Sequence, residues 1–530
     1  MEKRLVIAIA LSIVIILSFQ SMVVKQKKAR ETVAPVGEIA APVQTKAPEI
    51  APYPVSKPSF EEKLLEASTD KYIMTFSNVG GSIKAIRLKE YKNLGTDKPL
   101  DLVDIENPEE YIFALSEPSS PGALDMSEYS VAREDGAVVY SKTAGDFKII
   151  KKYILRNNKN GIELQVFIKN ISSSRQPFRY KIVGGSGLTE EKAQDKAVIA
   201  ATAKVNEKKV NYKRPRNDER ITNSGAVNWI ALHNKYFSLI VKPLGQAKDQ
   251  FHYLNRDGLL VTGVETDISA IAPGATAENR YLLYAGPSNI PVLKEFGYEL
   301  DETIDYGFFG GISKILITAM RLCYNIVRNW GVSIILLAIL LNIVLFPLTV
   351  KSFKSMQKMQ ELQPQMEKLK AQYKGNPQKL NQEVMELYKK YGINPLSGCL
   401  PLLLQMPIFF ALYQALMKSI ELRNSSFLWI KDLSSPEAIP IPITLPIIGN
   451  TINILPLAMV AAMVFQQKMS TRSTGAGVTE EQKQQQKMML IIMPIMFGFL
   501  FYNMPSGLVL YWIVSTVMTI SEQALVLKKA

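Results

Sequence analysis

WGVSIILLAILLNIVLFPLTV occupies residues 330–350 of this 530-residue chain, and LPLLLQMPIFFALYQALM occupies residues 400–417. Each run is apolar and close to the length of about 20 residues with which an α-helix crosses a bilayer. The segment between them, residues 351–391, is rich in lysine, and Asn342 lies in the middle of the first run. Two spans joined by a charged segment, with an amide inside one of them, suggest work on something that passes through the membrane.

Four further apolar runs lie at residues 5–24, about 446–465, 488–502 and 508–527. With residues 331–350 and 400–417 they predict an α-helical polytopic membrane protein with six spans. Residues 1–30 are expected to form an uncleaved N-terminal anchor, because Lys25, Lys27 and Lys28 follow the apolar run where a signal peptide has small residues. A cleaved signal is the alternative interpretation.

The composition excludes several kinds of site. The formal net charge of +14 suits anionic lipid or ribosomal RNA better than a specific nucleic-acid sequence in a chain with six spans. The two cysteines, Cys323 and Cys399, are far apart and indicate no disulfide framework. His233 and His252 have no acidic or cysteine neighbours at metal-ligand spacing, so we expect no metal and no cofactor.

The region outside the spans divides into a tether and a folded domain. Residues 31–58 are rich in proline and alanine and predict an extended linker. Residues 59–305 contain short runs of alternating apolar and polar residues, as at Ile162, Leu164 and Val166, separated by turn-forming residues. This pattern predicts a large all-β sandwich. Its expected role is that of a folding or docking scaffold, since its sequence shows no paired catalytic residues.

Residues 306–329 are predicted to form an amphipathic helix in the membrane interface. Lys314, Arg321 and Arg328 lie on one face, and apolar residues recur at helical spacing on the other. The apolar positions are Phe308, Ile312, Ile315, Ala319, Leu322 and Ile326. The alternative is a helix packed on the β-domain, but direct continuation into the span at Trp330 favours the interface.

Residues 351–391 predict two antiparallel helices joined by a tight turn around residues 374–377, because each half carries one apolar stripe. Lysines outnumber acidic residues here, which places the hairpin in the cytoplasm. The basic tail at residues 528–530 then also lies inside, and the β-domain lies outside. The charges around the first span indicate the opposite orientation, but the even number of spans and the hairpin outweigh them.

Polar residues inside the spans are candidates for a hydrated groove. Burying an unpaired amide costs a few kcal/mol, so Asn342 is expected to face other helices or water. Gln405 adds a second amide in another span. The alternative role for Asn342, equally favoured, is a hydrogen bond between helices. The short run at residues 488–502 is expected to thin the bilayer locally.

Several of these segments resemble the Oxa-type insertase superfamily. The resemblance is carried by NWGVSII, FPLTVKSFKSMQKM, LQPQMEKLK, INPLSGCLPLLLQMPIFFALYQAL, FLWIKDLS and MPSGLVLYWIVST, and more weakly by FSNVGGSIKAIRL and YAGPSN in the β-domain. It implies a core of five spans at residues 330–527, a periplasmic β-sandwich and a location in the bacterial inner membrane. It also implies a membrane insertase and chaperone, which is not an enzyme and acts on nascent membrane proteins, alone or with the Sec translocon, with the ribosome as a further possible partner.

The resemblance also assigns positions. Met406, Phe409, Leu500 and Trp512 fall where the family's substrate-contacting residues lie, and each is equally compatible with helix packing. Met356, Met359 and Met366 would receive substrates on the hairpin through adaptable apolar contact, with packing inside the hairpin as the alternative. The family usually has an arginine at the position of Asn342, so electrostatic attraction of acidic substrate residues is not expected here.

Two other classes of function, a secondary transporter and an intramembrane protease, fit the sequence less well. A secondary transporter with a periplasmic solute-binding domain would carry inverted repeats, which the sequence lacks. An intramembrane protease is disfavoured because neither HExxH nor GxSxG occurs, and the absence of a P-loop excludes ATP as the driving force.

Overall fold

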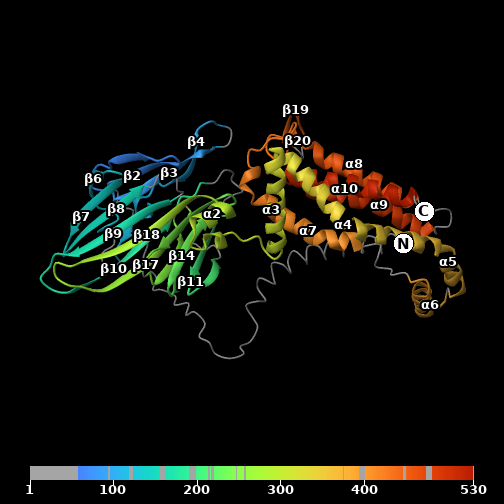
Figure 1. The fold of residues 1–530 in the computed structure, drawn as a ribbon, viewed down its shortest axis with the longest axis horizontal. Coiled ribbons are helices and arrows are strands. Elements are labelled where there is room, and N and C mark those ends of the chain that lie inside the picture. The colour runs from blue at the N-terminus through green and yellow to red at the C-terminus, as the bar shows by residue number, and fades with distance from the viewer. Residues whose placement is uncertain are drawn as a thin grey trace.

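The computed structural model describes residues 58–528, apart from residues 94–95, 118–122, 156–160, 190–198, 213–214, 216–219, 246, 256–257, 374, 393–399, 446–448 and 473–479. The predicted anchor at residues 1–30, nearly all of the linker at residues 31–58 and the last two residues of the tail lie outside this range. A β-domain and a helix bundle lie end to end (Figure 1).

The described residues of the β-domain form three antiparallel sheets. The four-stranded sheet has the order β1 (Leu64–Ser68), β2 (Tyr72–Ser77), β3 (Ser82–Lys92), β4 (Pro99–Asp104). The five-stranded sheet has the order β13 (Arg220–Ser224), β16 (Asp249–Leu254), β17 (Leu260–Ile271), β10 (Gln176–Gly185), β5 (Leu115–Ser116). The nine-stranded sheet has the order β12 (Lys208–Tyr212), β11 (Ala200–Val205), β14 (Val227–His233), β15 (Phe237–Pro243), β18 (Thr276–Pro287), β9 (Gly161–Asn170), β8 (Phe147–Leu155), β7 (Ala137–Ala144), β6 (Ser130–Glu134).

The nine-stranded sheet is the central layer. Alternation along β14 sends Ile230 and Leu232 into the main core shared with the two smaller sheets, whereas Trp229 and Ala231 face the opposite side. There they pack under α2 (Ile290–Phe296) and the turn η3 (Leu300–Thr303). The predicted alternating strands therefore build the β-rich domain that the sequence indicates.

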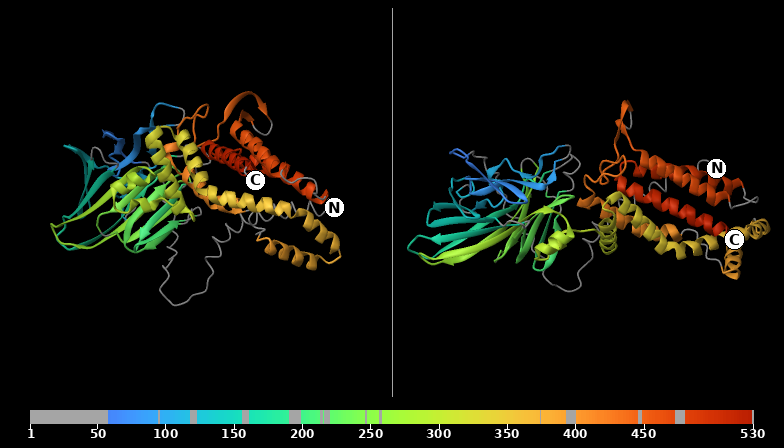
Figure 2. Two further views of the ribbon diagram at one scale, coloured as in Figure 1. Left: turned by 45° about the vertical axis from the view of Figure 1, so that its right-hand side comes forward. Right: turned by 45° about the horizontal axis from the view of Figure 1, so that its top comes forward.

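In the part of the chain that the structure describes, the helix bundle has five long helices besides the helix at its outer end, which we define as the end next to the β-domain. They are α4 (Trp330–Glu361), α7 (Leu400–Met417), α8 (Ile454–Arg472), α9 (Glu480–Phe501) and α10 (Ser506–Lys528). Within the described residues, α4 and α10 are long and apolar enough to cross a membrane, and α8 and α9 contain shorter apolar segments. The helices run side by side (Figures 1 and 2).

Helix α3 (Gly310–Val327) forms across the outer end of the bundle, within the predicted range of residues 306–329. Leu316 and Met320 pack into the core of the bundle. The predicted apolar stripe faces the other way: Ile315 is 68% exposed and Ile326 is 82% exposed. An apolar face that the protein leaves uncovered fits a helix with one side toward lipid.

The lysine-rich segment differs in one respect from the expected hairpin at residues 351–391. Its first leg does not start as a new helix, because α4 continues without a break from Trp330 to Glu361. The break falls at Leu362, before α5 (Gln363–Gln372), where Pro364 lies in the first turn and has no N–H to donate. Helix α6 (Pro377–Lys390) returns and packs against α5 through Leu362 and Tyr388.

One predicted span boundary was wrong, and one predicted short apolar run belongs to a longer helix. The helix expected at about residues 446–465 starts only at Ile454, because residues 449–452 pair with a preceding strand and Gly449, Asn450 and Thr451 are poor helix formers. Residues there form a hairpin of β19 (Ile439–Leu445) and β20 (Gly449–Ile452). The span expected at residues 488–502 extends back to Glu480, which gives a helix of 22 residues. Its apolar part is the short segment Leu490–Phe501.

One loop joins the two domains. After α7, Ile420 of the turn η5 (Ile420–Leu422) is buried within the main core of the β-domain. Glu421 accepts hydrogen bonds from Arg321 of α3 at 2.5 Å and from Asn289 at 3.1 Å. Arg423 donates to the carbonyl of Lys92 at 2.8 Å. The β-domain and the bundle are therefore held together by side chains of this loop.

Candidate functional site

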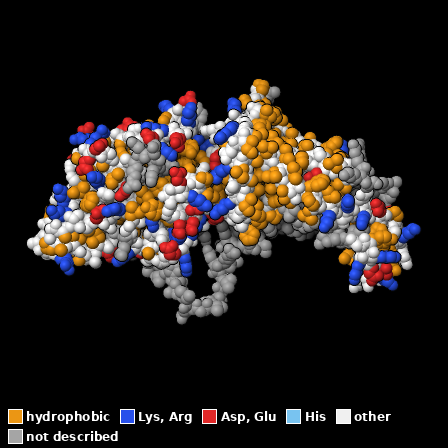
Figure 3. Space-filling model, viewed as in Figure 1, with side chains coloured by type: hydrophobic (Ala, Val, Ile, Leu, Met, Phe, Trp, Pro, Cys, Tyr) orange, Lys and Arg blue, Asp and Glu red, His pale blue; other side chains and the backbone are white. Residues whose placement is uncertain are grey.

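The exposed surface along the sides of the helix bundle is apolar. Among the exposed residues are Phe499 at 85%, Val344 at 66% and Ile495 at 61%. Figure 3 shows apolar side chains over the bundle and mixed charges over the β-domain. A patch of this size on a water-soluble protein would drive association, so its solvent is a hydrocarbon phase.

Polar side chains lie inside this apolar surface. Asn342 of α4 is 8% exposed, and its Nδ2 donates to the Ala338 carbonyl at 2.7 Å and to Ser515 Oγ of α10 at 3.2 Å. Gln405 Nε2 of α7 donates to the Tyr511 hydroxyl at 2.9 Å, and Tyr511 lies one turn nearer the outer end of α10 than Ser515. Tyr511 and Ser515 are four residues apart and share one face of α10. The side-chain amides of Asn342 and Gln405 both donate hydrogen bonds to that face.

An aromatic cluster adjoins this face. Phe409 of α7 contacts Trp512 of α10 edge to face, with 5.4 Å between ring centroids. Phe501 of α9 lies 5.6 Å from Phe409 and 5.2 Å from Trp512. Phe497 packs on Trp512 at 5.7 Å. The rings join α7, α9 and α10, so Phe409 and Trp512 contribute to helix packing whatever else they contact.

The remaining predicted groove residues are placed differently. Met406 is 37% exposed and Leu500 is 50% exposed, and neither belongs to the aromatic cluster. The structure thus brings Asn342 and Gln405 onto α10, joins Phe409 to Trp512, and leaves Met406 and Leu500 at the apolar surface. Sequence reasoning missed Tyr511 and Ser515, although their four-residue spacing in an apolar span was a usable signal.

The predicted hairpin methionines are largely occupied by packing. Met359 and Met366 lie against the buried pair Leu362 and Tyr388, and the Tyr388 hydroxyl donates to Met366 Sδ at 3.0 Å. Met356 lies on α4 outside this cluster. The exposed methionine of the hairpin is Met385, at 57%. The packing alternative therefore applies to Met359 and Met366.

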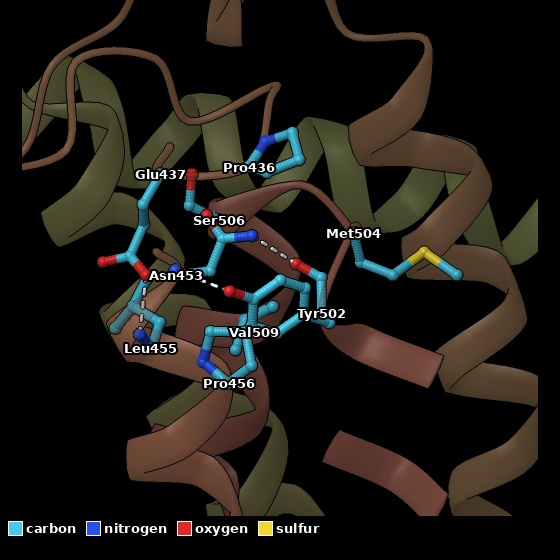
Figure 4. Close-up of a pocket in the computed structure, with 9 residues that line it drawn as sticks. All are labelled: Pro436, Glu437, Asn453, Leu455, Pro456, Tyr502, Met504, Ser506 and Val509. Carbon is cyan, nitrogen blue, oxygen red and sulfur yellow. Dashed lines mark hydrogen bonds between the residues drawn. The ribbon is translucent and has the colours of Figure 1, made fainter. Parts of the chain in front are cut away.

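A polar network closes the outer end of the bundle. The buried Glu437 accepts from Trp429 Nε1 at 2.5 Å and from the backbone N–H of Leu455 at 2.6 Å, so it caps the N-terminus of α8. Asn453 Nδ2 donates to the Tyr502 carbonyl at 2.7 Å, and its Oδ1 accepts from Ala438 N–H at 2.8 Å. Figure 4 shows Glu437 and Asn453 beside Leu455, Tyr502 and Ser506, with the bonds to Leu455 and Tyr502 as dashed lines.

The start of α10 completes the closure. Ser506 Oγ donates to the carbonyl of Asp432 at 3.0 Å and to that of Ser435, and Gly507 N–H donates to Leu433 at 2.9 Å. These bonds satisfy donors at the helix N-terminus that would otherwise face lipid. They also hold the loop before β19 against the ends of α8 and α10.

Arg321 does not supply a charge beside Asn342. It lies on α3 at the outer end, where its guanidinium is bonded to Glu421. Asn342 is therefore left as an uncharged polar group, paired to Ser515.

A bundle that is apolar outside, carries hydrogen-bonded polar residues inside and is attached to a large β-domain defines an integral membrane protein with an extramembrane domain. Comparison with known proteins gives the particular family. The family described as "60Kd inner membrane protein" matches residues 322–530, and the "YidC periplasmic domain" matches residues 64–319.

Curated relatives agree over the whole chain. The "Membrane protein insertase YidC" of Geotalea daltonii is 33% identical and covers 100% of this chain and 99% of its own length. That of Geobacter metallireducens is 32% identical, with coverage of 100% and 98%. The solved structure "Active YidC insertase crystal structure with the first transmembrane domain resolved" is 20% identical, covers 88% of this chain and 93% of its own, and has a TM-score of 0.37.

The chain belongs to the YidC family of membrane protein insertases. It is an inner membrane protein with a periplasmic β-domain, and it acts on nascent membrane proteins in the bilayer. The predicted function is confirmed, the transporter and protease alternatives are set aside, and insertion is not an enzymatic activity.

Proposed function

We propose that the face of α10 with Tyr511 and Ser515 lines a groove that receives polar parts of a substrate while its apolar segment passes sideways into lipid. The observation that carries this proposal is the polar row formed by Asn342, Ser515, Gln405 and Tyr511 inside an apolar bundle. These side chains exchange hydrogen bonds with one another, so a polar substrate segment has partners available when it displaces them. Release is driven by burial of the substrate's apolar helix in lipid.

The proposed topology has six spans, with both termini and the α5–α6 hairpin in the cytoplasm. Lysines of the hairpin support this orientation. The β-domain then lies outside, in the periplasm, and the network around Glu437 and Asn453 closes the groove on that side. A groove closed at one end takes a segment in from the cytoplasm without leaving an open aqueous pore.

The hairpin is the proposed first contact for nascent chains. Met385 and Tyr391 are exposed on it, whereas Met359 and Met366 support its fold. Exposed methionine suits substrates of varied sequence because its side chain is flexible and polarisable. The Sec translocon and the ribosome are the proposed partners at this face, with the lysines of the hairpin facing ribosomal RNA. In this role the protein also acts as a chaperone.

Asn342→Leu tests the groove. It removes the amide that bonds Ser515, so insertion of substrates with charged outer tails should fall more than insertion of a simple apolar single-span protein. Ile343→Leu is the matched control, because Ile343 is 58% exposed at the next position and faces lipid. Both variants are measured by protease protection of the substrate tail in cells depleted of the native protein. Equal insertion of both substrates by Asn342→Leu contradicts the proposal.

Crosslinking places the substrate. In a chain with Cys323 and Cys399 replaced by serine, single cysteines at Met406 and Phe409 should crosslink to stalled nascent chains. A cysteine at Asp97, whose side chain is 96% exposed in the β-domain, serves as the control and should not crosslink. Crosslinks at Asp97 and none at Met406 would place the substrate path elsewhere.

A further inference from the structure

The β19–β20 hairpin has no role in the groove. It lies between α7 and α8 and belongs to a charge-free stretch, since residues 438–467 contain no Asp, Glu, Lys or Arg. In β19, Pro440 and Pro442 are exposed, and Ile439 and Ile441 are half-buried. An exposed apolar hairpin at the periplasmic end of a membrane bundle needs a partner that covers it.

The base of the hairpin is fixed to the bundle. Glu437, directly before it, caps α8 through the Leu455 N–H, and Asn453, directly after it, bonds the Tyr502 carbonyl at the end of α9. Asn453 Oδ1 also accepts from Ala438 N–H, which ties the two ends of the hairpin together. Both strands therefore leave the bundle at a set height relative to α8 and α9.

That height is the outer surface of the bilayer. The apolar part of α8, Ile454–Met469, has 16 residues, or about 24 Å of helix against a hydrocarbon thickness of about 30 Å. The charge-free stretch continues from α8 back into the hairpin. The hairpin projects sideways from the bundle, at the end that α3 also crosses (Figures 1 and 2). Its direction and level match those of an element lying along the membrane surface.

The backbone of the hairpin suits lipid better than another protein strand. A two-stranded hairpin leaves N–H and C=O groups unpaired along both edges, which is costly deep in hydrocarbon and tolerable near headgroups and water. Pro440 and Pro442 each lack an N–H, so β19 presents two donors fewer. Missing donors also oppose the addition of a further strand.

Trp429 supplies an anchor of matching chemistry at the base of the hairpin. Its indole N–H is bonded to Glu437, yet the residue remains 51% exposed, and the adjacent Leu428 is 74% exposed. Tryptophan held at a polar site with its ring left uncovered is typical of the membrane–water interface.

We propose that the β19–β20 hairpin lies in the periplasmic leaflet of the bilayer, at the level of the phospholipid headgroups and upper acyl chains, as a second interfacial element at the same end of the bundle as α3. It lengthens the apolar surface of the short helix α8 and, with α3, holds the bundle at a fixed depth. The inference rests on the proposed placement of the bundle in the membrane.

Fluorescence quenching tests it. In the full chain with Cys323→Ser and Cys399→Ser, an environment-sensitive dye is attached to Pro442→Cys and the protein is reconstituted into vesicles of phosphatidylethanolamine and phosphatidylglycerol. Emission should be blue-shifted relative to dye at Asp97→Cys. It should be quenched by phospholipid spin-labelled near the headgroup and protected from iodide. Dye at Asp97→Cys should show the reverse quenching.

Phe499→Cys, at an 85% exposed position of α9, separates the two levels of inference. If its dye is not quenched by spin-labelled lipid, the placement of the bundle fails. If Phe499→Cys is quenched by lipid but Pro442→Cys is quenched by iodide, the hairpin lies in water and the inference is overturned alone. Protection of Pro442→Cys from both quenchers also overturns it, because the hairpin is then covered by protein.

Discussion

The β-domain buries Trp229 and Tyr180 and carries most of its charged side chains outside, whereas the helix bundle exposes Phe499 and Ile326 and keeps Asn342 and Gln405 within. The two regions belong to one chain and differ in solvent. In water, apolar burial stabilises the fold and an unpaired buried polar group costs about 1–3 kcal/mol. In lipid, apolar burial between helices contributes little and packing dominates.

The difference shows which polar groups each region tolerates inside. Lys151 of β8 is fully buried, and its Nζ donates to the carbonyls of Gly80 and Phe113 at 2.7 and 2.6 Å. It joins the nine-stranded sheet to loops next to the four-stranded sheet, and burial lowers its pKa well below the usual value. In the bundle the two predicted amides bond to neutral groups, Asn342 to Ser515 and Gln405 to Tyr511.

Lys151→Met should have the largest effect. It removes the buried donor to the Gly80 and Phe113 carbonyls, of which Gly80 keeps the Ser82 hydroxyl, so we expect the β-domain to lose about 3 kcal/mol of unfolding free energy. The matched control is the adjacent Lys152→Met, which removes a surface pair with Glu134 and should cost less than about 0.5 kcal/mol. Guanidinium unfolding of the full chain in detergent measures both. Equal costs would show that Lys151 does not join the sheets.

The pH dependence of unfolding stability tests the same domain, and its expected effect is smaller than that of Lys151→Met. Burial, with Lys418 and Lys209 nearby, lowers the pKa of His233 to about 4. Its unfolded value is near 6.5, so the stability it contributes is present above about pH 6.5 and is lost as the pH falls toward about 4. Allowing for partial exposure of the ring, the loss should be about 2 kcal/mol.

His233→Gln keeps a hydrogen-bonding partner for Thr202 and removes the titration. The difference between the unfolding midpoints of native chain and variant, measured from about pH 7 to about pH 4, should therefore shrink or reverse sign at the acid end. A constant difference across that interval would refute the assignment.

The contact that links the β-domain to the bundle should have the third-largest effect on stability. Arg321 and Glu421 are 24% and 15% exposed, so their pair is partly shielded from water and should contribute about 1 kcal/mol of coupling in a cycle of Arg321→Met and Glu421→Gln. The exposed pair of Arg179 and Asp267 is the reference, with an expected coupling below about 0.5 kcal/mol. Equal coupling in the two cycles would mean that the joint is no stronger than an ordinary surface pair.

Ser515→Ala should have the smallest effect. Hydrogen bonds between membrane helices average about 0.6 kcal/mol, and Asn342 retains the Ala338 carbonyl as partner. Ser521→Ala, at an exposed site of the same helix, is the control and should be neutral. Unfolding in mixed detergent micelles measures the shift. A loss above about 2 kcal/mol would remove the contrast with the β-domain, since polar contacts would then matter equally in both.

Prediction from sequence succeeded where a pattern repeats over many residues. The alternating strands, α3 and the α5–α6 pair follow from periodicity, because a face that must be buried recurs every 2 or about 3.6 residues. It failed at boundaries. Residues 446–453 carry no charge, and Gly449, Asn450 and Thr451 among them were the signal against a helix there.

In the candidate site, too, some residues could be predicted from the sequence and others depended on tertiary packing. Asn342 and Gln405 stood out because an amide in an apolar run is unusual. Their partners Ser515 and Tyr511 are common residues, and their selection depends on α10 lying against α4 and α7. Met359 and Met366 were assigned to substrate contact by resemblance, whereas their packing against Leu362 and Tyr388 required the return of α6.

The amino-acid sequence by itself determined the membrane helices, the β-domain and the family, since hydropathy, alternation and motifs are properties of neighbouring residues. The tertiary structure alone decided that Ile420 enters the core of the β-domain, that Glu437 and Asn453 close the outer end, and that the β19–β20 hairpin projects at the level of α3. These contacts join residues far apart in the chain, and only the packing of whole elements brings them together.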